Sequence, residues 1–362
     1  PSLDFNLAPD DIDSKEVIIS NIGEEGSLMY FSAGVSPFSS IGGGPGNFGN
    51  FWSDSDIDSD INFDWIDISE VGTQYSFPGN DQSGEQIELG FNFSFLGGQY
   101  TQCIINANGW VGFGNDSDAW ENTSIPSSSA PGPAIFGLWD DLNPVNDQCN
   151  SYCSGNVYYY GDEEKFIVWF NEVAHWWTNF ENKFYDFQIV MYSDGRIDIN
   201  YNSIDEHTAT IGIQDGSGVS GLQVAFDQSY LHDLLSLKFS QGPDWISVSP
   251  STGEVNSGSS EVLLVTANAS DQEEGLYEGY LRLVTGGGNA GVPVSMLVSG
   301  STIQPGDING DENINIQDII YLINFILNVD EPDSYQFNAA DINDDGVLNI
   351  QDIIIITNII IN

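Results

Sequence analysis

One 22-residue pattern occurs twice near the end of this 362-residue chain. Residues 306–327 read GDINGDENINIQDIIYLINFIL, and residues 340–361 read ADINDDGVLNIQDIIIITNIII. The copies are offset by 34 residues and are identical at 12 of 22 positions. Each opens with oxygen-bearing side chains at loop positions 1, 3, 5, 9 and 12 and continues into an apolar run. A calcium ion takes about six to eight oxygen ligands, so the spacing predicts two calcium-binding loops, each followed by a helix.

The predicted ligands occupy the same positions in both loops. In the first loop they are Asp307, Asn309, Asp311, Asn315 and Asp318, with the backbone carbonyl of Asn313. In the second loop they are Asp341, Asn343, Asp345, Asn349 and Asp352, with the carbonyl of Val347. Gly346 allows a sharp turn at position 6 of the second loop, where the first loop carries Glu312. We therefore expect the first site to be more strained or weaker than the second.

Paired loop–helix units with Asp at position 12 and Asn at position 9 closely resemble a type I dockerin, and the resemblance covers residues 305–362. It implies calcium binding and docking onto cohesin-like proteins in extracellular assemblies. It also implies that loop positions 10 and 11 help to select the partner, and these are Ile316 and Gln317, then Ile350 and Gln351. The hydroxyl pair common in cellulosomal dockerins is missing here, which argues against an ordinary cellulosomal partner.

Acidic residues dominate the charge of the chain, with 54 acids, 6 bases and a formal net charge of −48. Repulsion excludes nucleic acid and anionic membrane surfaces as natural partners. The solubilising surface of a salt-adapted organism is an alternative explanation for this charge. No stretch reaches about 18 uninterrupted apolar residues, so the sequence predicts no membrane-spanning helix. Cys149 and Cys153 share one loop and predict a local disulfide in an oxidising compartment, which agrees with an extracellular protein.

The residues before 300 show the pattern of β-strands. Short alternating runs such as KEVIIS, KFIVWF and DFQIVMY are separated by turns of Gly, Asn, Asp and Ser. This pattern predicts β-sandwiches. The expected fold is mainly β, with two β-sandwich domains, one inserted in the other, and a small helical calcium-binding domain at residues 301–362.

Residues 1–35 and 241–300 together resemble one immunoglobulin-like repeat of the BACON or abnormal-spindle-like type. The motifs are SLDF and SKEVIISNIG in the first part and WISVSPSTGEV and GVPVSMLV in the second. The resemblance implies a discontinuous sandwich with residues 36–240 inserted in one loop, which loops tolerate at low entropic cost. An independent N-terminal unit is the alternative, but residues 1–34 alone cannot bury a core.

The insertion carries runs such as IINANGWVGFG and IFGLWDDLNP. It resembles the β-sandwich that follows catalytic domains in many secreted bacterial proteases, and it is distantly similar to nidogen-type extracellular modules. The resemblance specifies architecture and implies no particular activity.

A run of alternating acids precedes the first of these motifs, at Asp54, Asp56, Asp58 and Asp60. In an extended strand the four carboxylates would share one face, and their repulsion predicts a further calcium ion there. A solvated acidic loop is the alternative.

No pattern typical of an active site occurs, so we expect no enzyme. The chain has no HExxH or GxSxG motif, and its histidines are His175, His207 and His232 in unrelated contexts. Asp140 and Asp141 are adjacent, and neighbours on a strand point to opposite faces and cannot easily flank one bond. His175, Trp176 and Trp177 are consecutive and cannot all face inward, so we expect an exposed contact site there for carbohydrate or protein.

Two functions follow from these observations. The first is a non-catalytic extracellular subunit of a filament or sheath, which docks onto copies of itself or onto a cohesin-like protein. A broad isoleucine face on the terminal helices favours it: Ile319, Ile320, Ile323, Ile326, Ile353, Ile354 and Ile356. The second is a dockerin-borne targeting or carbohydrate- or protein-binding module released from a secreted protease-like precursor. Because the sequence begins at Pro1 without Met, we expect a removed signal peptide or such a precursor.

Overall fold

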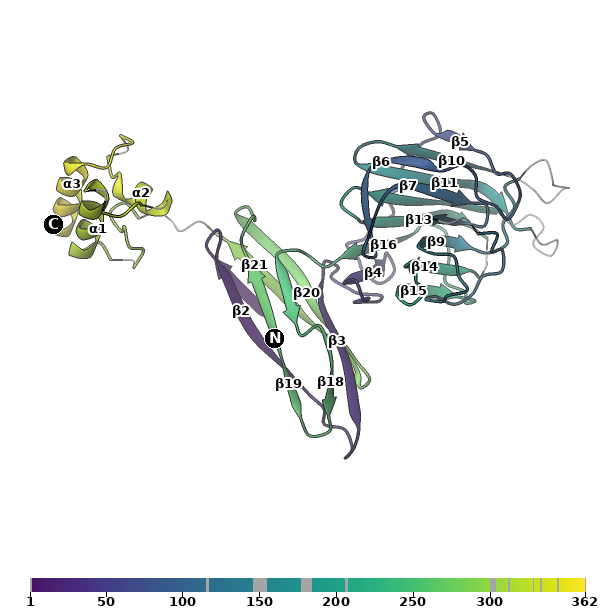
Figure 1. Cartoon of the computed structure of the whole chain (residues 1–362), viewed down its shortest axis with the longest axis horizontal. Helices are drawn as coiled ribbons and strands as arrows, with labels where there is room; N and C mark the ends of the chain where they lie inside the picture. Colours follow the sequence, from purple (N-terminus) through teal and green to yellow (C-terminus); the bar gives the residue numbers. More distant parts are fainter. Residues whose placement is uncertain are drawn as a thin grey trace. The chain divides into compact units, whose positions relative to one another are not determined.

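The computed structural model describes residues 2–114, 117–145, 155–176, 184–205, 208–299, 304–311, 313–327, 329–332, 334–343 and 345–361. Within them the strands all precede residue 299 and the helices all follow residue 315 (Figure 1). The predicted fold class, mainly β with a small helical region at the C-terminal end, is confirmed.

Two antiparallel sheets combine strands from the start of the chain with strands that follow residue 245. The five-stranded sheet has the order β1 (Leu3–Leu7), β21 (Gly288–Val298), β20 (Gly275–Thr285), β3 (Leu28–Ser36) and β18 (Thr252–Asn256). The three-stranded sheet has the order β17 (Ile246–Ser249), β19 (Ser260–Asn268) and β2 (Ile12–Ser20). A small core joins the two sheets through Ile19, Phe31, Ala33, Val255, Leu263 and Leu283.

Two larger sheets form a sandwich from the strands between residues 50 and 241. The seven-stranded sheet has the order β4 (Asn50–Asp54), β16 (Leu235–Gln241), β13 (Ile197–Ile204), β12 (Phe184–Tyr192), β11 (Lys165–Ala174), β10 (Asn156–Gly161) and β5 (Thr73–Tyr75). The six-stranded sheet has the order β15 (Gly221–Phe226), β14 (Thr210–Gln214), β9 (Ala134–Trp139), β8 (Trp110–Gly112), β7 (Gly98–Asn106) and β6 (Ile87–Phe95).

Aromatic residues fill the core of this sandwich. Phe170 of β11 and Phe187 of β12 stack with ring centroids 4.6 Å apart and an interplanar angle of 4°, and both are fully buried. Phe93 of β6 packs on Phe113, which follows β8 of the same sheet, with ring centroids 5.5 Å apart. Alternate residues of β12, namely Tyr185, Phe187, Ile189 and Met191, contribute to this core, as the period of two in the sequence predicts.

The strands that enter and leave this sandwich are paired. β4 and β16 run antiparallel from the Leu237–Asp54 pair to the Gln241–Asn50 pair. Beyond them the backbone N–H of Gly242 donates to the carbonyl of Gly49 at 3.1 Å. An inserted domain needs adjacent entry and exit points, and we propose on this ground that the sandwich is inserted at residues 36–240.

The C-terminal segment forms three helices, α1 (Ile316–Ile326), α2 (Ser334–Ala340) and α3 (Ile350–Ile361). Asn315 caps α1, and a capping box with Asp318 completes its first turn. The helices share a core of Ile308, Ile319, Leu322, Phe325, Ala339, Ala340 and Ile356. The sequence predicted helices only after the two loops, which is wrong, because α2 leads directly into the second loop. No helix of the described residues is long and apolar enough to cross a membrane.

Candidate calcium-binding and docking site

The two predicted calcium loops hold their ligand side chains with the same backbone hydrogen bonds. In the first loop the N–H of Asp311 donates to Oδ1 of Asp307 and of Asn309, at 3.1 and 3.0 Å. In the second loop the N–H of Asp345 donates to Oδ1 of Asp341 and of Asn343, both at 3.1 Å. The side-chain oxygens at positions 1 and 3 are thereby turned toward the inside of each loop.

The match continues at positions 7 and 9 of the loops. The side-chain amide of Asn315 donates to the carbonyl of Asn313 at 2.9 Å, and that of Asn349 donates to the carbonyl of Val347 at 2.9 Å. Both asparagines also cap the helix that follows, since Asn315 Oδ1 accepts from the N–H of Gln317 at 2.8 Å and the second copy repeats this bond. Position 9 of each loop, and through it position 7, is therefore tied to the first turn of a helix.

The position-12 carboxylates, Asp318 and Asp352, differ between the loops. Both are fully buried, and in each Oδ2 accepts from the N–H of the asparagine at position 9. Asp318 Oδ1 also accepts from the N–H groups of Ile308 and Asn309, at 2.8 and 3.1 Å. Asp352 Oδ1 is buried and has no hydrogen-bond partner within the described chain.

The orphaned Asp352 oxygen tests whether these residues fit a calcium ion. A buried carboxylate oxygen without a donor is costly, and a cation coordinated by that oxygen would remove the cost. The other predicted ligands are all oxygens, which suits a hard cation. The residues present therefore fit calcium, and the ligand assignment stays a prediction for the individual positions.

Glycines shape the two loops at different positions. Gly346, at position 6 of the second loop, has φ +78°, as predicted for a sharp turn. The first loop has a left-handed residue too, Gly310 at position 4 with φ +70°. Position 6 alone does not reveal this residue, whereas the Asn-Gly pair inside the first loop is a sequence signal for it. Glu312 lies outside the described residues.

The isoleucine-rich helices present apolar side chains to both the core and the surface. Of the predicted face, Ile319 and Ile356 are buried in the core, and Ile326 and Ile353 pack against it. The remaining members of that face, Ile320, Ile323 and Ile354, are exposed. The predicted isoleucine face is therefore divided between the core and the surface, because a helical period of 3.6 residues points adjacent side chains about 100° apart.

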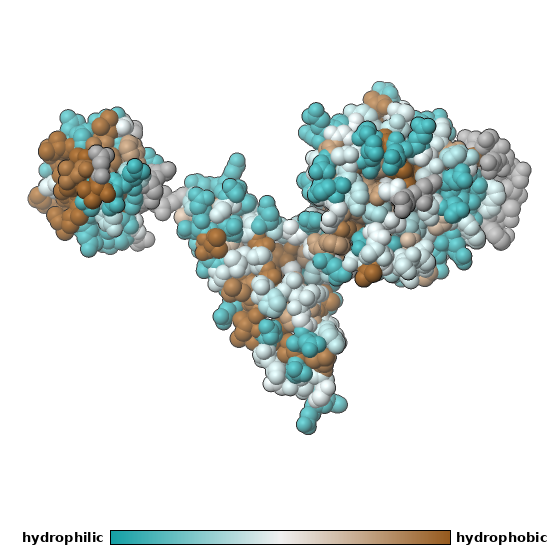
Figure 2. All heavy atoms as spheres, in the orientation of Figure 1, coloured by the Kyte–Doolittle hydropathy of each residue, from teal (hydrophilic) through white to brown (hydrophobic). Residues whose placement is uncertain are grey.

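The exposed apolar side chains instead form two equivalent stripes. On α1 the side chains of Ile316 and Ile320 are 63% and 53% exposed, and on α3 those of Ile350 and Ile354 are 68% and 55% exposed. The pair on α3 is related to the pair on α1 by the same 34-residue offset as the calcium loops. Figure 2 shows hydrophobic surface gathered on these helices. We call these four residues the isoleucine stripes.

The predicted selector residues lie within and beside the stripes. Gln317 is exposed next to Ile316, and with Ile320, Tyr321, Asn309, Asn324 and Asp330 it lines a shallow groove of about 420 Å3. Gln351 is exposed next to Ile350 and accepts a long hydrogen bond, 3.4 Å, from the Asn343 amide. All four predicted docking residues therefore lie on the surface.

The alternating acids at residues 54–60 do not share a strand face. β4 ends at Asp54, whose Oδ1 accepts from the N–H groups of Asp56 and Ile57, each at 3.0 Å. Asp58 instead accepts from the Ser39 hydroxyl at 2.6 Å. The prediction of one shared face is wrong, because each buried carboxylate caps a turn, and the repulsion argument for calcium fails with it. Among the described residues, no group of three or more His, Cys, Asp or Glu side chains could hold a metal.

Two further contacts complete this cluster. Asp56 pairs with His232 at 2.9 Å, while Asp60 donates its N–H to Asp58 at 3.0 Å. Burial tends to raise the pKa of Asp58, but hydrogen bonds from Ser39, Ser40 and Asp60 outweigh it and lower the pKa below its usual value. The four acids therefore have separate roles in holding the turn.

The predicted contact site at residues 175–177 divides between core and surface. His175 is buried, 3.6 Å from Asp140, whereas Trp176 is 40% exposed. Trp177 lies outside the described residues, as do His207, Cys149 and Cys153. Asp140 and Asp141 follow the end of β9, and burial raises the pKa of Asp141 to about 7, opposed by the charge of His175.

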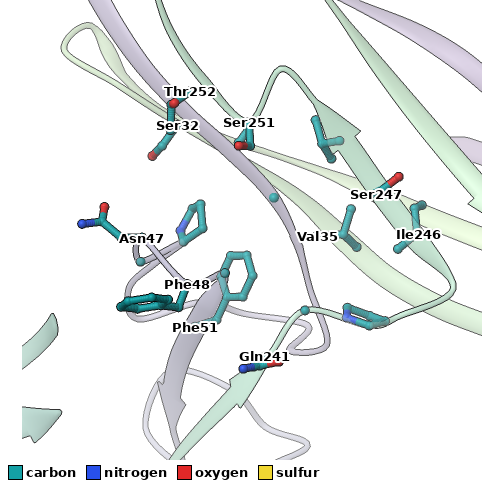
Figure 3. A pocket seen from close by; sticks show the side chains of 18 residues that line it. Ser32, Val35, Asn47, Phe48, Phe51, Gln241, Ile246, Ser247, Ser251 and Thr252 are labelled. Atoms are coloured by element: carbon teal, nitrogen blue, oxygen red, sulfur yellow. The ribbon is translucent and has the colours of Figure 1, made fainter. Parts of the chain in front are cut away.

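A groove of about 580 Å3 is lined by residues of β3, β17 and β18 and of the segments next to β4 and β16 (Figure 3). Its apolar wall includes Phe48, Phe51, Val35 and Ile246, and hydroxyl groups surround it. None of its lining residues is charged, although the chain carries 54 acids.

The fold and the loops together define a modular, β-rich protein with a C-terminal pair of calcium-type loops and exposed helices. The family described as NIDO related matches residues 59–256, and the chain belongs to this family. The match ends with β18, beyond the predicted end of the insertion at residue 240. The family described as dockerin type I domain matches residues 305–361. A comparison with curated proteins finds no match.

These matches establish the class of the protein in part. Dockerin type I domains bind calcium and cohesin partners, and proteins that contain them are typically extracellular or on the cell surface. NIDO-related and dockerin domains are non-catalytic modules. The BACON-type identity of the smaller sheets stays a prediction.

Proposed function

We propose that this chain is a non-catalytic assembly subunit that works outside the cell and docks through its C-terminal module when calcium is bound. The observation that carries the proposal is the pair of isoleucine stripes, equally exposed on α1 and α3 and each attached to a calcium-type loop. Exposed side chains of this size on both helices of a small module favour a partner surface.

The loops connect calcium to this surface. Calcium, when bound, supplies positive charge to a loop rich in carboxylates. The chain itself orients the ligands through backbone N–H groups, and Asn315 and Asn349 join each loop to the first turn of its helix. An ordered loop therefore fixes the helix that carries each stripe, so that docking and folding of the module both depend on calcium.

Burial of the stripes supplies the driving force for docking. Removing one isoleucine side chain from water contributes roughly 1.5–3 kcal/mol. Each stripe therefore has enough apolar surface to anchor a contact, while Gln317 and Gln351 beside it offer amide groups that select polar partners. We propose that the two stripes contact different neighbours, which permits copies of the chain to join into a filament or sheath. Docking of one stripe onto a cohesin-like protein is the alternative.

Assembly in the presence and absence of calcium tests this function. We expect the full chain to form oligomers or filaments at millimolar calcium, visible by electron microscopy and light scattering, and to dissociate with a chelator. Ile316→Asp combined with Ile350→Asp should abolish assembly while calcium binding persists. Val219→Asp, at a 71% exposed site in the larger sandwich, is the matched control. Monomers in both conditions would refute the filament, and capture of a cohesin by such monomers would favour the alternative of a targeting module released from a precursor.

A further inference from the structure

A cavity of about 840 Å3 opens at one edge of the larger sandwich. It lies between β5, the last strand of the seven-stranded sheet, and β6, the last strand of the six-stranded sheet. Residues of the segment between these strands and Tyr159 of β10 complete its lining. The volume falls within the range of about 300–1,000 Å3 that is usual for small-ligand sites.

Three aromatic rings form one wall of this cavity. Tyr75 contacts Phe77 edge to face at 5.1 Å and Tyr159 edge to face at 6.1 Å. The Tyr75 hydroxyl donates to the carbonyl of Glu85 at 2.7 Å, which fixes the ring between the two strands. Phe77 and Tyr159 are only half-buried, so each has ring surface that the protein does not cover. The wall is therefore rigid and partly exposed.

Residues with amide and carboxylate side chains also belong to the lining. The Gln74 amide donates to Asn156 Oδ1 at 2.7 Å, which leaves its carbonyl oxygen available. Gln86 is exposed. Neither its side chain nor the carboxylate of Glu85 has a hydrogen bond to any described residue. Glu88 accepts a hydrogen bond from Gln102. The lining therefore offers both donors and acceptors to a ligand.

We propose that this cavity binds a neutral oligosaccharide. A pyranose ring has an apolar C–H face, which packs on an aromatic ring, and a rim of hydroxyls that each donate and accept hydrogen bonds. Glutamine amides also donate and accept, so Gln74 and Gln86 match that rim. Glu85 and Glu88 are the charged residues of the lining, and they repel uronate or sulfate groups.

A basic peptide fits this site less well. Its ammonium or guanidinium groups would pair with the two carboxylates, whereas the glutamine N–H donors would find acceptors only in its backbone carbonyls. The half-buried rings of Phe77 and Tyr159, each held edge to face against Tyr75, also match a flat sugar face better than a flexible side chain. The proposal concerns a site far along the chain from the isoleucine stripes, and it does not depend on the docking function.

Binding of the full chain to arrayed neutral, uronate-bearing and sulfated oligosaccharides tests the proposal, with a lysine-rich peptide as a further probe. We expect binding to neutral oligosaccharides only, confirmed by titration calorimetry with the free sugar. Phe77→Leu keeps apolar volume but removes the ring, and Gln86→Ala removes an exposed amide that supports no part of the fold. Each should weaken binding about tenfold, which corresponds to about 1.4 kcal/mol.

Matched controls come from the uncharged groove of Figure 3, where Phe48→Leu and Gln241→Ala make the same chemical changes. These variants should bind the sugar as the unchanged chain does, and so should the Ile316→Asp, Ile350→Asp double variant. The proposal is overturned by the absence of neutral-sugar binding, by preference for anionic sugars or the peptide, or by equal affinity in the Phe77→Leu and Gln86→Ala variants. Intrinsic tryptophan fluorescence confirms that each variant is folded.

Discussion

Replacing the position-12 carboxylate of each calcium loop by asparagine should produce two different results. In Asp352→Asn the group that is changed has one buried oxygen without a donor. In Asp318→Asn the corresponding oxygen already accepts two backbone N–H groups, at 2.8 and 3.1 Å. The Asp352 carboxylate therefore needs a bound cation to contribute its full stabilisation. The Asp318 carboxylate also organises its loop without a cation, through its backbone hydrogen bonds.

The size of each effect follows from these contacts. At a calcium concentration roughly 100 times the dissociation constant, a lost site removes about 2.7 kcal/mol of stability. Asp352→Asn should lose about this amount with calcium and nothing in a chelator, because a neutral amide is less costly to bury than a carboxylate. Asp318→Asn should lose about 1–3 kcal/mol even in the chelator, because backbone N–H groups there lose an acceptor.

Far-UV circular dichroism measures the difference directly. In the described residues the helices all belong to the C-terminal segment, so the helical signal reports on this module within the full chain. Thermal unfolding of both variants is followed with calcium and with a chelator. Equal losses by the two variants in the chelator, or an unchanged Asp352→Asn midpoint in calcium, would refute the assignment of the orphaned oxygen to a cation.

Three further predictions concern the larger sandwich. Since burial raises the pKa of Asp141 to about 7, the folded chain keeps a proton that the unfolded chain releases near pH 4, so stability should fall between these values as pH rises. Asp141→Asn should remove that decrease in unfolding experiments followed by tryptophan fluorescence. Phe187→Ala should cost about 3–5 kcal/mol in urea unfolding, against less than about 0.5 kcal/mol for Val219→Ala. Cys103 is fully buried, and burial raises its pKa, so its thiol should not be alkylated in the native chain. If Cys149 and Cys153 form the predicted disulfide, mass spectrometry should detect no alkylated thiol before unfolding and one after it.

The parts of the site that the sequence predicted well are local. Each loop and the first turn of its helix lie within about a dozen residues, and their repetition at a fixed offset separates ligand positions from chance acids. The capping asparagines Asn315 and Asn349 follow the same logic, because an Asn before an apolar periodic run is a helix start signal. Helix α2 could not be predicted in this way, since SYQFNAA has neither a repeated partner nor a pronounced apolar period.

The alternating acids show where a local pattern fails. An alternation of charged and uncharged residues places the charges on one face only if the backbone is extended. Asp and Asn side chains also accept from N–H groups two and three residues further on, which favours turns. Asp54 and Asp58 do this, and so the same letters encode two capped turns after β4 instead of a strand.

The aromatic cavity could not be predicted, because its parts are distant in sequence. Tyr75 and Tyr159 are 84 positions apart, and only the pairing of β5 with β10 brings them together. The sequence indicated a contact site at residues 175–177 instead, where Trp176 is exposed and His175 is buried. Sheet pairing, and not residue type alone, decides which aromatic rings face the solvent. The chain has a large excess of acids, so a partner that brings further negative charge would be repelled. The proposed neutral ligand at the sandwich edge and the calcium-dependent contact at the helices both avoid this repulsion.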